Sequence, residues 1–316
     1  MGGMPRRRFK KRYLALIVML VLFLLINAPG LVAVGYRLWY VPRVAGFPPV
    51  VLGQERLLVL SPHPDDETLC CAGAIQRVLR AGGQAYVAWL TSGDGFEWDV
   101  TLTQHTLRPR GPALLELGNR RILEARKAAG ILGIPEANLY FLGYPDRGLL
   151  PLITDPLRRY RSPLTGMDRV PYPETLSPGA AYTGQNLERD LEGVLDRVKP
   201  TLILAPSPQD AHPDHRATGE LAIRVLGRRG ELERLRYWIV HGGLEWPLPK
   251  GLHPTLPLEP PPRGRGLEWE RLDLDPQEVQ TKLEATRAHA SQMGLLSRFM
   301  LAFVRQNELL SPTPLP

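Results

Sequence analysis

The sequence predicts an α/β fold, a Rossmann-like and mostly parallel sheet with helices on both faces, preceded by an N-terminal transmembrane helix. Short apolar segments alternate with helical segments through most of the chain, which is the order that builds parallel βαβ units. Glycine or proline residues end several of these segments. A long uncharged run near the N-terminus predicts the additional helix.

Each element follows from local pattern. Short, continuously apolar segments predict strands at 57–60, 85–90, 139–142, 201–205 and 237–240. Apolar residues at helical spacing predict helices at about 68–81, 119–132, 187–198 and 214–227, and a charged helix is expected at about 276–292. The stretch 145–184 is rich in Pro, Gly, Arg and Tyr and is expected to be a long insertion that shapes a site.

The net charge of +7 is concentrated at one end of the chain. Residues 1–12 contain six Lys and Arg residues, and the remaining 33 basic residues nearly balance the 32 acidic ones. The folded body therefore has no excess positive charge, and we expect no nucleic-acid partner.

Residues 13–36 contain no charged side chain and are long enough for a membrane anchor. On this interpretation 1–12 is a cytoplasmic basic tail, 37–54 a linker and 55–310 an extracytoplasmic catalytic domain of a single-pass protein of the cell membrane. The alternative is a cleavable signal peptide with its apolar core at 14–26 and a small-residue site near Ala33.

Two short polar segments follow predicted strands directly. They are Pro62-His-Pro-Asp-Asp-Glu67 and Asp210-Ala-His-Pro-Asp-His215. Open α/β sheets gather ligands and catalytic groups at the carboxyl ends of their strands, so we expect the two segments to meet. Their imidazoles and carboxylates are suited to one divalent metal, zinc above all, with a position left open for water.

Asp65 and Asp66 cannot have the same task, because adjacent side chains in a turn point in different directions. One can bind the metal while the other faces the water and removes its proton. Cys70 and Cys71 are expected to be buried side chains near the start of a helix and not a disulfide, because neighbouring cysteines are poorly placed to pair.

The sequence resembles the PIG-L/LmbE-like zinc-dependent N-deacetylases. His63-Pro-Asp-Asp-Glu67 is similar to the opening motif of that family, and His212-Pro-Asp-His215 is similar to its second motif. Weaker similarities follow in the family's order, at 91–95, 121–133, 142–146 and 282–308. The resemblance covers about 56–308, although 151–181 has no clear counterpart.

The resemblance implies a role for each candidate residue. The zinc ligands would be His63, Asp66 and His215, with one Zn²⁺ per chain. Asp65 would be the general base, His212 as a cation would stabilise the oxyanion, and Asp214 would orient a histidine ring. Arg121, Asp146 and Asp94 would contact the sugar. No contact with the site is expected for His105, His241, His253 and His289, and Glu67 is expected only to place charge in the first turn of its helix.

The resemblance implies a hydrolase that removes the acetyl group from an N-acetylglucosamine-type glycan or glycolipid. Its expected partner is an N-acetylated amino sugar, carried on a lipid or in the cell envelope. Two alternatives stay open. His and Asp clusters also serve metallophosphoesterases, although these usually need two metals. A catalytically inactive, membrane-tethered glycan-binding module would need no general base, which Asp65 supplies.

Overall fold

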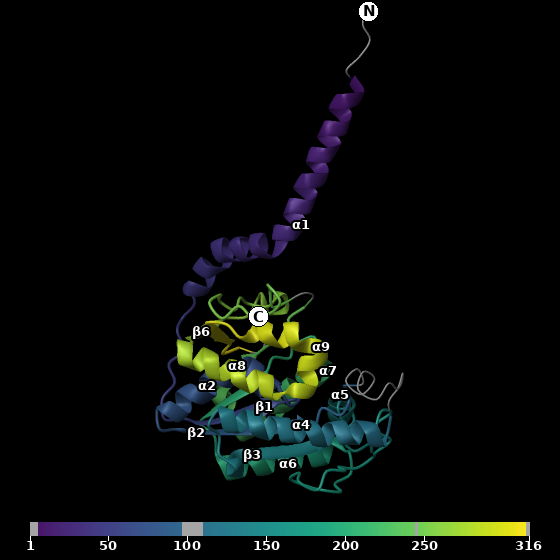
Figure 1. Ribbon diagram of the computed structural model, residues 1–316. Helices are drawn as coiled ribbons and strands as arrows, with labels where there is room; N and C mark the ends of the chain where they lie inside the picture. Colours follow the sequence, from purple (N-terminus) through teal and green to yellow (C-terminus); the bar gives the residue numbers. More distant parts are fainter. Residues whose placement is uncertain (1–5, 97–109, 244–245, 314–316) are drawn as a thin grey trace, which may run out of the picture.

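The computed structural model describes residues 6–96, 110–243 and 246–313 of the 316-residue chain. Its centre is a sheet of five parallel strands in the order β3-β2-β1-β4-β5 (Figure 1). The strands are β1 (Arg56–Ser61), β2 (Gln84–Thr91), β3 (Leu139–Tyr144), β4 (Leu202–Pro206) and β5 (Leu235–Trp238). Each coincides with a predicted strand to within about two residues, so the predicted parallel sheet is confirmed.

Helices cover both faces of the sheet. One face carries α2 (Asp66–Arg80), α4 (Pro112–Ile131) and α8 (Pro276–Ala288), and the other carries α5 (Leu149–Thr154), α6 (Gly184–Val198) and α7 (Pro213–Arg229). Successive side chains of β1 alternate between the two cores, with Leu57 and Val59 in one and Leu58 and Leu60 in the other. A strand buried on both faces must be apolar throughout, which is why this segment is so clear in the sequence.

The C-terminal region differs from the expectation of one helix at 276–292. Helix α8 begins at a capping box formed by Asp275 and Glu278, and the chain then breaks at His289 before α9 (Ala290–Met300). Strands β6 (Glu270–Asp273) and β7 (Asn307–Leu310) form a separate antiparallel pair that local pattern did not predict. Short 3₁₀ turns occupy 136–138, 232–234, 262–264 and 301–303.

The predicted membrane anchor at 13–36 is wrong. Helix α1 (Arg6–Ala45) includes these residues and changes direction along its length (Figure 1). Within the described part of the chain, no helix combines the length and the apolar character that crossing a bilayer requires. The unbroken apolar run covers only 14–26, about 20 Å of helix, and Asn27 and the Pro29-Gly30 pair follow it. The single-pass membrane location with an extracytoplasmic domain is corrected accordingly.

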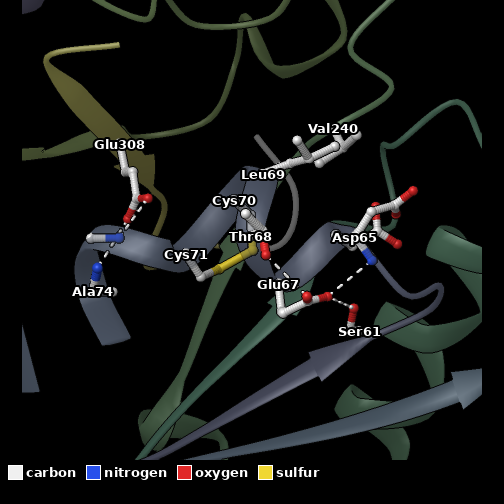
Figure 2. Close-up of a disulfide and its surroundings, with 12 residues drawn as sticks. Ser61, Asp65, Glu67, Thr68, Leu69, Cys70, Cys71, Ala74, Val240 and Glu308 are labelled. Atoms are coloured by element: carbon white, nitrogen blue, oxygen red, sulfur yellow. Dashed lines mark hydrogen bonds between the residues drawn. A yellow bond between two sulfur atoms is a disulfide. The ribbon is translucent and has the colours of Figure 1, made fainter. Parts of the chain in front are cut away.

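The two cysteines also differ from expectation. Cys70 and Cys71 are buried near the start of α2, as predicted, but a disulfide joins them (Figure 2). At this point the side chain of Glu308 accepts hydrogen bonds from the amides of Gly73 and Ala74, at 2.8 and 3.0 Å. The carbonyl of Leu69 accepts from the Lys282 ammonium at 2.8 Å. Buried side chains from distant parts of the chain thus contact the backbone of α2 around the cysteines.

Candidate metal centre and active site

The carboxyl ends of the five strands surround a cavity of about 210 Å³. The loop after β1 supplies His63, Asp65 and Asp66, and the loop after β3 supplies Asp146. The loop after β4 and the first turn of α7 supply His212 and His215. The two predicted motifs therefore meet at one edge of the sheet, as parallel topology requires.

Three donor atoms form a compact triangle. His63 Nδ1 lies 3.3 Å from an Asp66 carboxylate oxygen, the same oxygen lies 3.2 Å from His215 Nε2, and the two nitrogens are 3.3 Å apart. Ligand atoms about 2.0–2.1 Å from a tetrahedral zinc ion lie roughly 3.3–3.4 Å from one another. The donor types and their spacing therefore fit a zinc ion bound by His63, Asp66 and His215.

Carboxylates hold the far nitrogens of both imidazoles. His63 Nε2 lies 3.3 Å from Asp214 and 3.4 Å from Asp146, and His215 Nδ1 lies 3.2 Å from Asp210. All three carboxylates are buried. Outer carboxylates of this kind fix the ring orientation and tautomer of histidines that bind metals.

The electrostatics of the cluster favour a cation. Burial opposes charge on His215, but Asp210 and Asp66 outweigh it and raise the pKa of His215 to about 10. Burial also opposes charge on His63, and Asp146, Asp214 and Asp66 together raise its pKa well above the ordinary value. Burial would raise the pKa of Asp66, yet the two histidines lower it. The buried carboxylates thus stabilise positive charge at this point, which a divalent metal supplies.

Asp65 lies beside the triangle and contacts the cavity. Its carboxylate accepts a hydrogen bond of 3.0 Å from Arg121, whose guanidinium also donates to the carbonyls of Gly93 and Pro64. Burial raises the pKa of Asp65 to about 6, although Arg121 opposes the shift. A carboxyl group with a pKa near neutrality is well matched to proton transfer.

His212 is the N-cap residue of α7 and lines the cavity. Its Nδ1 accepts from the amide of Asp214 at 3.3 Å, which leaves the proton on Nε2. Burial, together with His63 and His215, lowers the pKa of His212 far below the ordinary value. The surroundings therefore favour a neutral imidazole that donates through Nε2, rather than the expected cation.

The predicted sugar contacts separate into two layers. Arg121 and Asp146 line the cavity. Asp94 lies behind it, where it accepts hydrogen bonds from the Tyr172 hydroxyl at 2.7 Å and the Asp146 amide at 3.3 Å. Burial raises the pKa of Asp94 to about 7. Tyr172 belongs to the 151–181 insertion, so that insertion buttresses the site through Asp94.

The expectation that His241 makes no contact with the site is wrong. His241 lines the cavity just beyond β5, with its ring centroid 4.7 Å from that of His215. Asp210 belongs to the second predicted motif, and its role as the anchor of His215 was not predicted. His289 is fully buried and lies 3.3 Å from Glu67. One feature of the sequence could have indicated His241: it directly follows the strand predicted at 237–240, and in the structure the corresponding strand β5 lies next to β4. His253 lies outside the cavity lining, and His105 lies outside the described residues.

The rest of the cavity wall is largely apolar. It is formed by side chains from α2, α9 and the loops after β2 and β5: Leu69, Phe96, Val240, Leu296, Phe299 and Met300. Phe299 packs nearly parallel to His241, with centroids 5.8 Å apart and an interplanar angle of 11°. A polar floor and an apolar wall suit an organic substrate held against a metal centre.

Curated relatives are similar to most of the chain. A probable N-acetyl-alpha-D-glucosaminyl L-malate deacetylase 2 of Bacillus anthracis is 26% identical over 242 residues, which is 76% of this chain and 83% of the relative. A 1D-myo-inositol 2-acetamido-2-deoxy-alpha-D-glucopyranoside deacetylase of Corynebacterium efficiens is 26% identical over 251 residues, which is 76% of this chain and 73% of the relative.

Solved structures share the fold. The deacetylase of the antimicrobial reagent A40926 pseudoaglycone superposes with a TM-score of 0.52 at 19% identity, covering 82% of this chain and 97% of the other. The family model described as PIG-L, GlcNAc-PI de-N-acetylase, matches residues 58–226, just over half of the chain. The matched range contains both histidine motifs and the donor triangle, and the chain is a member of the PIG-L family of N-deacetylases.

Proposed function

We propose that this protein hydrolyses the N-acetyl amide of an N-acetylglucosamine-type sugar and uses one zinc ion per chain. The observation that carries the proposal is the triangle of His63, Asp66 and His215 donor atoms, 3.2–3.3 Å apart, with the Asp65 carboxylate beside it in the same cavity. Relatives whose names specify N-acetylated glucosamine derivatives support the substrate class.

In this proposal His63, Asp66 and His215 hold the metal, and Asp214, Asp146 and Asp210 orient the two imidazoles. A bound zinc ion supplies Lewis acidity, which makes water easier to deprotonate and polarises the amide carbonyl. The remaining chemistry belongs to side chains of this chain.

Asp65 accepts a proton from the attacking water, whose oxygen forms the new bond to the carbonyl carbon. His212 donates a hydrogen bond from Nε2–H to the carbonyl oxygen as negative charge develops there, and keeps its proton. The C–N bond then breaks, and Asp65 returns the proton to the leaving amine. Acetic acid and a free amino sugar are the products, and the acid releases its proton to give acetate at neutral pH, so atoms and charges balance without a further cofactor.

Substrate contacts complete the proposal. Arg121 and Asp146 both line the cavity and offer a cation and a carboxylate to sugar hydroxyls. Asp94 does not line the cavity; it holds Asp146 in place by accepting a hydrogen bond from the Asp146 amide. We assign the acetylated end of the substrate to the polar floor and the remainder to the apolar wall that includes Phe299.

The test measures acetate release from N-acetylglucosamine glycosides by the purified protein with and without a zinc chelator. Phosphate monoesters and diesters are assayed in parallel. Chelator-sensitive acetate release without phosphate release is expected. Hydrolysis of phosphate esters alone would replace the proposal with a metallophosphoesterase, and sugar binding without turnover would replace it with a binding module.

A further inference from the structure

Asp65 has an uncommon backbone conformation. Its φ is 146°, and it is one of three non-glycine residues with positive φ in the described part of the chain. Such a conformation is energetically unfavourable for a residue with a side chain and persists only where the surroundings enforce it. Because Asp65 is also the proposed general base, the contacts that enforce this conformation determine where its carboxylate lies.

The backbone of Asp65 is held on both sides. Its carbonyl accepts from the amides of Thr68 and Leu69, each at 3.0 Å, as expected at the start of α2. Its own amide donates to the Glu67 carboxylate at 3.1 Å. Arg121 donates to the Asp65 carboxylate and to the Pro64 carbonyl, so the peptide preceding the base is held at its carbonyl by Arg121 and at its amide by Glu67.

Glu67 is itself immobilised and has no exposed surface. The oxygen that accepts the Asp65 amide also accepts from Trp89 Nε1 at 2.9 Å and from the Ser61 hydroxyl at 3.3 Å. The other oxygen accepts from the Thr68 hydroxyl at 3.0 Å and lies 3.3 Å from His289 Nε2 (Figure 2 shows the contacts with Ser61, Asp65 and Thr68).

The partners of Glu67 come from separate parts of the fold. Ser61 ends β1, Trp89 lies in β2 and stacks on Phe141 at 4.4 Å, and His289 lies at the break between α8 and α9. The sheet and the C-terminal helices thus fix one carboxylate. Since Glu67 cannot shift without breaking several buried hydrogen bonds, the Asp65 amide must conform to it.

We propose that Glu67 is a positioning residue: its carboxylate holds the Asp65 amide and so keeps the proposed general base directed at the metal-binding cluster. The inference rests on the proposed function, in which Asp65 moves the proton. Glu67 then does more than place charge in the first turn of its helix, which was the expectation from the sequence. The break between α8 and α9 at His289 also contributes, since it places the imidazole against Glu67.

Two substitutions separate geometry from charge. In Glu67→Gln the amide oxygen can still accept the Asp65 amide, while the new NH₂ group can donate to Thr68 and His289, so kcat should stay within about threefold of the wild type. Glu67→Ala removes the acceptor and should lower kcat roughly 10²-fold, the effect of a misplacement of about 1 Å, with KM and bound zinc unchanged.

Glu278→Ala is the matched control. Glu278 is also a carboxylate without exposed surface, and it binds Arg77 and the Asp275 amide, away from Asp65. It should lower the midpoint of thermal unfolding as Glu67→Ala does but leave kcat unchanged. If Glu67→Ala does not fold, Trp89→Phe removes the N–H that holds Glu67, together with some ring volume from the core, and should lower kcat at unchanged KM.

Three results would overturn the inference: Glu67→Ala losing no more kcat than Glu278→Ala, Glu67→Gln being impaired as severely as Glu67→Ala, or Glu67→Ala altering zinc content or KM instead of kcat. Crystal structures add a readout independent of turnover, since Asp65 should leave its positive φ in Glu67→Ala and keep it in Glu67→Gln. An inactive wild type would refute the proposed function, whereas an Asp65 that stays in place in Glu67→Ala would refute the positioning role alone.

Discussion

The guanidinium of Arg121 donates to the carboxylate of Asp65 at 3.0 Å, and both side chains are almost fully enclosed. This pair sets the ionisation of the proposed base. Burial alone would raise the pKa of Asp65 further, and the cation limits the value to about 6. The base must be ionised to accept a proton, so activity should rise with pH through about 6.

Removing the positive charge of Arg121 should change the pH range over which activity rises. Arg121→Gln should shift the midpoint of kcat/KM to higher pH, because the ionised form of Asp65 loses its favourable partner. Arg121→Lys keeps a positive charge and should leave the midpoint closer to that of the wild type. The measurement is the pH profile of acetate release, and a midpoint that stays fixed or falls in Arg121→Gln would contradict the pairing.

Outer carboxylates should tune metal affinity. His63→Ala removes a proposed ligand and should abolish zinc binding, whereas Asp210→Asn, which weakens the hold on His215, should reduce affinity about 10–100-fold. Isothermal titration with zinc measures both, and His253→Ala, outside the cavity lining, is the control. Equal zinc affinity in wild type and His63→Ala would refute the ligand assignment.

Glu259 should make stability depend on pH. Burial raises the pKa of Glu259 to about 7, and its Oε2 atom has no hydrogen-bond partner among the described residues. A carboxyl group with a raised pKa in the folded state favours folding below its unfolded pKa and loses that contribution as the pH rises toward 7. Glu259→Gln should therefore stabilise the protein by about 1–3 kcal/mol at pH 8 and have little effect at pH 4. Thermal unfolding at the two pH values measures the difference, and an equal effect at both would contradict the assignment.

Two glycines of α4 should respond in opposite directions to alanine. A methyl group at Gly118 would overlap the Tyr172 hydroxyl, which supports Asp94, whereas a methyl group at Gly130 would meet no atom within 4 Å. Gly130→Ala should stabilise the helix by about 0.5–1 kcal/mol. Gly118→Ala should destabilise the protein and lower activity through Asp94. Chemical denaturation of both variants, with acetate release, checks this, and a stabilised and fully active Gly118→Ala would show that Tyr172 is not needed there.

The local pattern of apolar residues was sufficient to predict the strands of the parallel sheet and the helices that cover it. The apolar run at 57–60 had to be a central strand because its alternate side chains enter two cores. The break at His289 could not be read from helical spacing, because the contact with Glu67, more than 200 residues earlier in the chain, defines that residue's place. The Cys70–Cys71 disulfide also coincides with a distant contact, the one that Glu308 makes with α2.

The site followed the same division. The motifs at 62–67 and 210–215 were predicted to meet because parallel strands place their carboxyl ends on one edge. His241 follows the strand next to β4, so the same rule could have included it, but a single histidine carries little signal. The role of Tyr172 could not be predicted, since its contact with Asp94 depends on how the insertion at 151–181 folds against the sheet. The predicted membrane anchor at 13–36 was wrong, since no helix among the described residues is long and apolar enough to cross a bilayer.

The most direct test of the account measures zinc content and acetate release together in Asp65→Asn. If Asp65 is the base and Asp66 a ligand, this variant retains one zinc ion per chain, while its rate on an N-acetylglucosamine glycoside falls on the order of 10²–10⁴-fold. A variant that loses its zinc would mean that the roles of Asp65 and Asp66 are exchanged, and a variant that keeps the full rate would contradict the proposed mechanism.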